Sequence, residues 1–125
     1  MKLFYIAGPL KASTGAGRLL NIQKAVEAAS VIRRYGGACI VPHLESLFHT
    51  EVCTEEEWLK QDFELITRCD ALIYLPGWSK SAGTKKEMEF SLQKKIPVYP
   101  WESLMGCLDD CCLKDYFLQI IRGAE

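Results

Sequence analysis

The stretch from residue 70 to residue 87, DALIYLPGWSKSAGTKKE, decides the fold class of this chain. It begins with a continuous apolar run, residues 70–75, which is typical of a strand buried on both faces of a sheet. Pro76 and Gly77 end the run, and after a loop of small residues a helix is expected from Gly83 to Lys94. A buried strand followed by a helix in this way indicates one unit of a parallel α/β sheet.

The alternation of strand and helix continues over the rest of the chain. Further strands are expected at residues 2–7, 38–41 and 96–99, and further helices at residues 21–35, 54–68 and 108–121. The helix at 54–68 has a well-defined start, because Thr54 and Glu57 form a capping-box pattern. These elements predict a flavodoxin- or Rossmann-like three-layer α/β sandwich with a four- to five-stranded parallel sheet, in one domain spanning residues 1–125.

The carboxyl ends of the predicted strands mark the edge where a ligand is expected, because open parallel sheets bind their ligands there. In this chain those ends are Gly8-Pro9, Pro42-His43, residues 76–83 and Tyr99-Pro100. We expect a functional site to be assembled from these four segments.

Composition and charge exclude several classes of protein. The 125 residues are 49% hydrophobic and 25% charged, as in soluble globular domains, which excludes a disordered chain. Lysine and arginine total 15 against 16 aspartates and glutamates, so no basic surface for a nucleic-acid polymer is expected. No apolar run is long enough to cross a membrane, and the first ten residues lack a signal-peptide layout. We expect a cytoplasmic protein with no membrane partner.

The six cysteines are interpreted as reduced thiols that pack as small hydrophobic side chains. A secreted disulfide scaffold would be shorter and would have a poorer core. Cys107, Cys111 and Cys112 form a CxxxCC pattern that lacks the paired spacing and the following histidine of common zinc sites. We therefore expect no metal site and no cofactor.

The first of two notable carboxyl groups is that of Asp62. On a helical wheel, Asp62 falls near the middle of the apolar side of the helix at 54–68. An aspartate placed there loses hydration, which costs several kcal/mol unless it is paired, protonated or facing a wet cleft. Asp62 is therefore either a structural residue that caps a loop or pairs with an arginine, or a general acid with a raised pKa.

The second carboxyl group is that of Glu87, at the edge of the sheet-facing stripe of the helix at 83–94. Its expected place in the first turn favours the ionised form, because a helix N-terminus carries partial positive charge. That placement alone needs no chemistry, so a structural role and a catalytic role stay equally open. Glu89 points nearly opposite and can pair with Lys85, as a solvated residue would.

The loop before that helix has the composition of an anion site. Residues 76–83 contain no acid, and they offer the hydroxyls of Ser79 and Ser81, the Lys80 ammonium and flexible glycines. Free N–H groups at a helix N-terminus can surround a phosphate together with such side chains. The alternative is an ordinary helix start at which Ser81 serves as the N-cap.

Four segments together resemble the nucleoside 2-deoxyribosyltransferase superfamily, and in particular its small phage and bacterial members of unassigned function. The segments are YIAGP at residues 5–9, Pro42-His43, WLKQDFELITRCD at residues 58–70, and LPGWSKSAGTKKE at residues 75–87. The resemblance covers residues 1 to about 100. It implies an enzyme that cleaves the N-glycosidic bond of a nucleoside, a deoxynucleoside or the corresponding 5′-monophosphate.

The resemblance also implies roles for individual residues. Glu87 matches the nucleophile that attacks the anomeric carbon, Asp62 the acid that protonates or orients the leaving base, and Tyr5 a tyrosine that hydrogen-bonds the nucleophile. The segment that lines the sugar and holds its 5′ group is matched by Gly8, Pro9, Ser79, Ser81 and Gly83. His43 is a candidate for contact with the base, and Trp78 either stacks on the base or covers the loop.

Ser81 indicates which substrate is used. Members that act on free nucleosides place a carboxylate at this position, whereas serine resembles the branch that hydrolyses 5′-monophosphates. The physical reason agrees, because a carboxylate repels a phosphate while a serine and free N–H groups hold it. We therefore expect cleavage of a nucleoside 5′-monophosphate. The alternatives are a 2-deoxyribosyltransferase acting on free nucleosides and a non-catalytic nucleotide-binding module.

The resemblance further implies a homodimer or higher oligomer, in which neighbouring subunits complete the site. The expected partner is a small-molecule nucleoside or nucleotide. The identity of the base, the choice between ribose and deoxyribose, and the choice between water and a second base as acceptor are not fixed by these residues.

Overall fold

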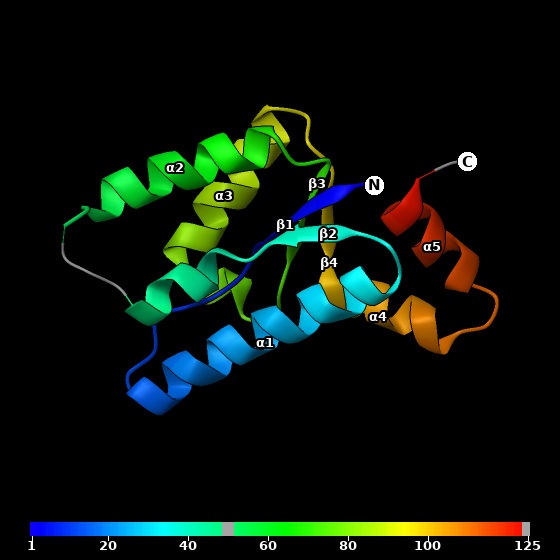
Figure 1. Cartoon of the computed structure of the whole chain (residues 1–125), viewed down its shortest axis with the longest axis horizontal. Coiled ribbons are helices and arrows are strands. Elements are labelled where there is room, and N and C mark those ends of the chain that lie inside the picture. The colour runs from blue at the N-terminus through cyan, green and yellow to red at the C-terminus, as the bar shows by residue number, and fades with distance from the viewer. Residues whose placement is uncertain (49–51, 124–125) are drawn as a thin grey trace.

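The computed structural model, which describes residues 1–48 and 52–123, contains a four-stranded parallel sheet (Figure 1). The strand order is β2-β1-β3-β4. Every neighbouring pair is parallel, and Tyr5 of β1 lies in register between Ile40 of β2 and Leu72 of β3. The strands are β1 (Leu3–Ala7), β2 (Ala38–Ile40), β3 (Ala71–Tyr74) and β4 (Val98–Pro100). The predicted α/β fold class is confirmed.

Helices cover both faces of the sheet (Figure 1). One face packs against α1 (Gly15–Arg34), α4 (Trp101–Asp109) and α5 (Lys114–Arg122), and the other against α2 (Glu55–Thr67) and α3 (Ala82–Gln93). Two short 3-10 helices, η1 (Pro42–Phe48) and η2 (Trp78–Lys80), follow the carboxyl ends of β2 and β3. Among the described helices, none combines the length and the hydropathy that crossing a membrane requires.

The alternation of side chains along β1 decides what faces each helical layer. Phe4 and Ile6 enter the core shared with α1, α4 and α5, whereas Tyr5 and Ala7 enter the smaller core shared with α2 and α3. Successive side chains of a strand point to opposite faces, so a single tyrosine in an apolar strand is directed wholly to one layer. Tyr5 thereby carries a hydroxyl group into the interface between the sheet and the α2–α3 pair.

The structure corrects three expectations about the helices. First, α1 begins at Gly15 rather than at residue 21, because the Thr14 side chain caps it by accepting from the Gly17 amide at 3.0 Å. Second, η1 forms between β2 and α2, where no helix was expected. Third, the single helix expected at 108–121 is two helices, since the Leu113 and Lys114 amides turn back to the Asp110 carbonyl at 3.0 Å.

Candidate active site

The site is built where the chain changes direction across the sheet. From β1 the chain crosses to β2 on one side, and from β3 it crosses to β4 on the other side. The loops that follow β1 and β3 therefore diverge, and such a switch point is where open α/β sheets form a crevice. The two strand ends are closely packed there, because a Cβ at Gly8 would lie 2.8 Å from Leu75 Cδ1. Only glycine fits at position 8 without displacing Leu75.

The central contact of the site joins β1 to α3. The Tyr5 hydroxyl donates a hydrogen bond to Oε2 of Glu87. Tyr5 is fully buried and Glu87 is only 8% exposed, so the contact is shielded from water. Glu87 lies on the buried face of α3 with Thr84 and Ser91, and the Ser91 hydroxyl donates to the Glu87 carbonyl at 2.8 Å. The expected hydrogen bond between Tyr5 and Glu87 is present.

Asp62 reaches the same place from α2. Its carboxyl group is half-buried and lies within hydrogen-bonding distance of the Tyr5 hydroxyl, and this contact lowers the pKa of Asp62. The position of α2 is fixed by Phe63, whose ring stacks on Phe90 of α3 with centroids 4.3 Å apart and an interplanar angle of 8°. Two carboxyl groups from different helices thus converge on one phenol.

Burial raises the pKa of both carboxyl groups. The pKa of Glu87 rises to about 8, with the negative charge of Asp62 adding to the effect and the hydrogen bond from Tyr5 opposing it. The pKa of Asp62 rises to about 6, again mainly through burial. Burial and the two carboxyl groups raise the pKa of Tyr5 far above the ordinary value, so Tyr5 acts as a hydrogen-bond donor.

This order of pKa values reverses the expectation from the sequence. Glu87 was expected in the first turn of its helix, in its ionised form, with Asp62 as the neutral partner. The helix begins at Ala82, so Glu87 is its sixth residue and lies in the second turn. The stabilisation of negative charge by a helix N-terminus fades beyond the first turn, and burial against Tyr5 outweighs what remains.

His43 braces the loop that follows β1. Its ring is 5% exposed, and Nε2 lies 3.0 Å from the Gly8 carbonyl oxygen. Burial lowers the pKa of His43, which favours the neutral ring with its proton on Nε2. Nδ1 is buried and has no hydrogen-bond partner among the described residues. The structure therefore ties His43 to the loop after β1, and contact between His43 and a base stays a prediction.

Ser81 caps the start of α3, and open space lies beside Gly83 in its first turn. The Ser81 hydroxyl oxygen accepts from the Thr84 amide at 3.2 Å and from the Thr84 hydroxyl at 2.9 Å, so Ser81 is the N-cap. The next two amides, of Ala82 and Gly83, precede the hydrogen-bond ladder of the helix. A Cβ at Gly83 would meet no atom within 4 Å, so open space lies beside Gly83 at the start of the helix. Ser79 and Lys80 are exposed beside it.

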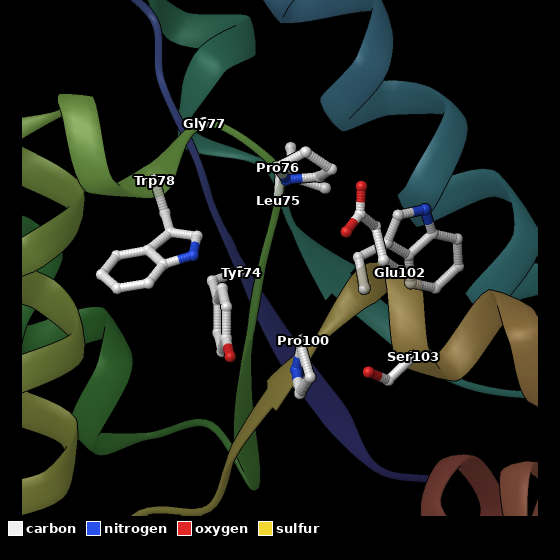
Figure 2. Close-up of a pocket in the computed structure, with 9 residues that line it drawn as sticks. Tyr74, Leu75, Pro76, Gly77, Trp78, Pro100, Glu102 and Ser103 are labelled. Atoms are coloured by element: carbon white, nitrogen blue, oxygen red, sulfur yellow. The ribbon is translucent and has the colours of Figure 1, made fainter.

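A cavity of about 360 Å³ opens at the carboxyl ends of β3 and β4 (Figure 2). Trp78 forms one wall and packs edge-on against Tyr74, with ring centroids 5.6 Å apart. Glu102 and Ser103 of α4 lie across the cavity from Trp78. Neither carboxyl group of the Tyr5 cluster lines this cavity. The sequence pointed to Trp78 but not to Glu102 or Ser103, because residues 101–107 were not expected to be helical.

Comparison with known proteins shows the family to which this chain belongs. Residues 1–99 match the model of a family described as a domain of unknown function, DUF4406. The chain belongs to this family. Every residue predicted for the site lies within the DUF4406 region, whereas α4 and α5 lie wholly beyond it.

Two solved structures share the fold of this DUF4406 protein. A 2-deoxyribosyltransferase from Bacillus psychrosaccharolyticus matches with a TM-score of 0.58 and 22% identity, over 78% of this chain and 70% of that one. A conserved protein from Enterococcus faecalis V583 matches with a TM-score of 0.66 and 17% identity, over 98% of this chain and 87% of that one. No curated protein matches the sequence significantly. At the level of the fold, the expected resemblance to the nucleoside 2-deoxyribosyltransferases is confirmed.

The chemistry open to this DUF4406 domain follows from the three converging side chains. A carboxylate that accepts a hydrogen bond from a buried phenol is held in one orientation and shielded from water, as a nucleophile must be. A second carboxyl group with a pKa of about 6 can deliver or take up a proton near neutral pH. Paired carboxyl groups of this kind are suited to displacement at a glycosidic carbon.

Proposed function

We propose that this protein cleaves the N-glycosidic bond of a nucleoside 5′-monophosphate, in its ribo or deoxy form. The observation that carries the proposal is the convergence of Glu87 and Asp62 on the Tyr5 hydroxyl at the switch point of the sheet. A structural role explains this cluster less well, because burying two carboxyl groups that form no ion pair with a lysine or arginine among the described residues disfavours the folded state. The fold shared with a 2-deoxyribosyltransferase supports the same conclusion.

The reaction takes place in two steps. Ionised Glu87 attacks the anomeric carbon while the bond from that carbon to the base nitrogen breaks. The bonding electrons leave with the base, which receives a proton from Asp62, and a glycosyl ester of Glu87 remains. Water then attacks the anomeric carbon and gives its proton to Asp62, and the ester bond breaks to restore the Glu87 carboxylate. The products are the free base and the 5-phosphorylated sugar.

Tyr5 supports both steps without exchanging its own proton. Its hydroxyl holds one oxygen of Glu87, which directs the other oxygen toward the sugar and stabilises the carboxylate when the ester breaks. The raised pKa of Tyr5 keeps this donor protonated throughout.

The order of the two pKa values makes the reactive protonation state a minor fraction of the protein. Reaction needs Glu87 ionised and Asp62 protonated, whereas pKa values of about 8 and about 6 favour the opposite. The reactive form is therefore a small minority at pH 7, and its share changes little between the two pKa values. The rate then follows a bell-shaped pH profile with limbs near pH 6 and pH 8.

The 5′-phosphate is proposed to bind at the start of α3. The Ala82 and Gly83 amides and the Ser81 hydroxyl proton are available there, and the exposed Lys80 adds positive charge. The crevice wall formed by Gly8 and Pro9, braced by His43, lines the sugar. Trp78 stacks on the base, since it already forms an aromatic wall of the neighbouring cavity.

Substitutions of Ser81 test the substrate class. Ser81→Asp and Ser81→Asn both keep a good N-cap, so they differ mainly by one negative charge at the proposed phosphate site. Base release from a panel of nucleosides and 5′-monophosphates is measured by liquid chromatography for the wild type and both variants. We expect the Asp variant to lose at least roughly tenfold in selectivity for monophosphates relative to the Asn variant, because a carboxylate repels phosphate. Equal selectivity in the two variants would place the phosphate elsewhere.

A transferase acting on free nucleosides is the second candidate, because one structure that shares the fold is a 2-deoxyribosyltransferase. The same panel, run with and without a free acceptor base, separates the two reactions. A transferase forms a new nucleoside when the acceptor base is added. A hydrolase releases base and phosphorylated sugar in both cases.

A further inference from the structure

The turn between α4 and α5 brings three metal-ligating side chains together. Asp110, Cys111 and Cys112 are consecutive, and each offers one ligand atom within 4.8 Å of the other two. All three side chains are exposed. The cysteine spacing predicted no metal site, but the structure adds the Asp110 carboxylate to the two thiols, and we propose that this turn binds a thiophilic divalent cation of the zinc type.

The separation of the two sulfurs fits coordination of a shared metal ion. The Sγ atoms of Cys111 and Cys112 are 4.0 Å apart. Two thiolates on a tetrahedral zinc ion, each at about 2.3 Å from the metal, lie about 3.8 Å from one another. A disulfide would instead require the sulfurs to approach to about 2.05 Å. The observed spacing of the two sulfurs is therefore close to that of a pair bound to one metal ion.

The backbone of the turn is already ordered by its own hydrogen bonds. Besides the two amides that turn back to the Asp110 carbonyl, the Cys112 amide donates to Asp110 Oδ1 at 2.8 Å. This bond orients the carboxyl group beside the sulfurs, and the carboxylate retains lone pairs for a metal. A site with three protein ligands leaves a fourth, open position for water.

The surrounding charge also favours a cation. Asp109 and Asp115 flank the turn, and both are exposed. The ammonium of Lys114 is directed to the Tyr35 ring, 5.9 Å from its centroid. Binding replaces two S–H protons by two sulfur–metal bonds, so two protons are released for each metal ion bound.

The site is separate from the proposed reacting centre. The α4–α5 pair packs on the face of the sheet opposite α2 and α3, which carry the carboxyl groups. A metal ion would hold the turn between the two helices whose Leu104 and Phe117 belong to the larger core. Its expected effect is on the stability of that helix pair.

Cadmium is the probe for the experiment, because its bonds to thiolates absorb in the ultraviolet. Reduced, metal-free protein is titrated with Cd²⁺, and the charge-transfer band is followed for the wild type, Cys111→Ser/Cys112→Ser, Asp110→Asn and Cys53→Ser. Cys53 is exposed and lies outside the cluster, so it serves as the matched control.

We expect one Cd²⁺ per chain for the wild type and Cys53→Ser, with no saturable band for the double variant. Asp110→Asn should keep the band with weaker affinity, by roughly tenfold, because one of three ligands is lost. Zn²⁺ should raise the melting temperature of the wild type but not that of the double variant. A band retained by the double variant, or one ion per two chains, would overturn the proposal.

Discussion

The buried carboxyl group of Glu87 should make the stability of the fold depend on pH. Burial raises its pKa from 4.5 to about 8, so the folded state holds the proton more tightly than the unfolded state. The stability that this group contributes is complete below about pH 4.5 and is lost progressively as the pH rises to about 8. The loss amounts to on the order of 4 kcal/mol, a large part of the stability of a small domain.

Glu87→Gln removes this dependence while keeping an oxygen that accepts from Tyr5. At pH 5 the variant and the wild type should be about equally stable, because Glu87 is protonated and neutral in the wild type. At pH 9 the variant should be more stable by on the order of 4 kcal/mol, because the wild type then holds a buried charge. Urea unfolding of both proteins in reductant, at several values between pH 5 and pH 9, measures the difference.

Glu89→Gln is the matched control, since Glu89 is exposed on the same helix. Its stability relative to the wild type should change little over the same pH range. A stability of Glu87→Gln relative to the wild type that is independent of pH, or that falls as the pH rises, would show that Glu87 is not buried as a neutral acid.

Four further predictions concern the same site and the assembly. Asp62→Asn should lower the rate by 10²–10⁴-fold. It should also abolish the falling limb of the pH–rate profile near pH 8 and move the rising limb from near pH 6 toward pH 8. A rising limb that stays near pH 6 would contradict the order of the two pKa values. Tyr5→Phe should raise the pKa of Glu87 further, so the falling limb should move to higher pH while the maximal rate drops. Gly8→Ala should destabilise the fold by about 1–3 kcal/mol in urea unfolding, because the added methyl group would lie within 3 Å of Leu75. Gly83→Ala should be neutral or stabilising, because its added methyl group meets no neighbour. Light scattering at micromolar concentration should give at least twice the 14.1 kDa of one chain, and a monomer would count against a shared site.

Periodicity and local capping were sufficient to predict most of the fold. The apolar run before Pro76 and the capping box at Thr54 are local signals, and the structure contains β3 and α2 where they indicated. The start of α1 was missed because Gly15 and Gly17 suggest a loop, whereas the Thr14 cap supplies what the glycines lack. The break between α4 and α5 was missed because the turn depends on backbone hydrogen bonds to Asp110.

For the site, the sequence predicted which residues come together but not the order of their pKa values. A helical wheel placed Asp62 and Glu87 near the sheet, and the resemblance added Tyr5; the structure brings all three together. The order of the pKa values could not be read from the sequence, because it depends on how deeply each carboxyl group is buried and on where α3 begins. The bond from His43 to Gly8 joins residues 35 positions apart, and no local pattern reports such a contact.

Base release by the wild type, Glu87→Gln and Glu89→Gln decides whether Glu87 attacks a glycosidic carbon. Each protein is incubated with the panel of nucleosides and 5′-monophosphates, and the free base is quantified by liquid chromatography. We expect base release by the wild type and Glu89→Gln, and a loss of at least roughly 10³-fold in Glu87→Gln, which lacks the nucleophile. Release of base by folded Glu87→Gln at the rate of the wild type, or no release by the wild type from any substrate, would exclude nucleophilic attack by Glu87 on these substrates.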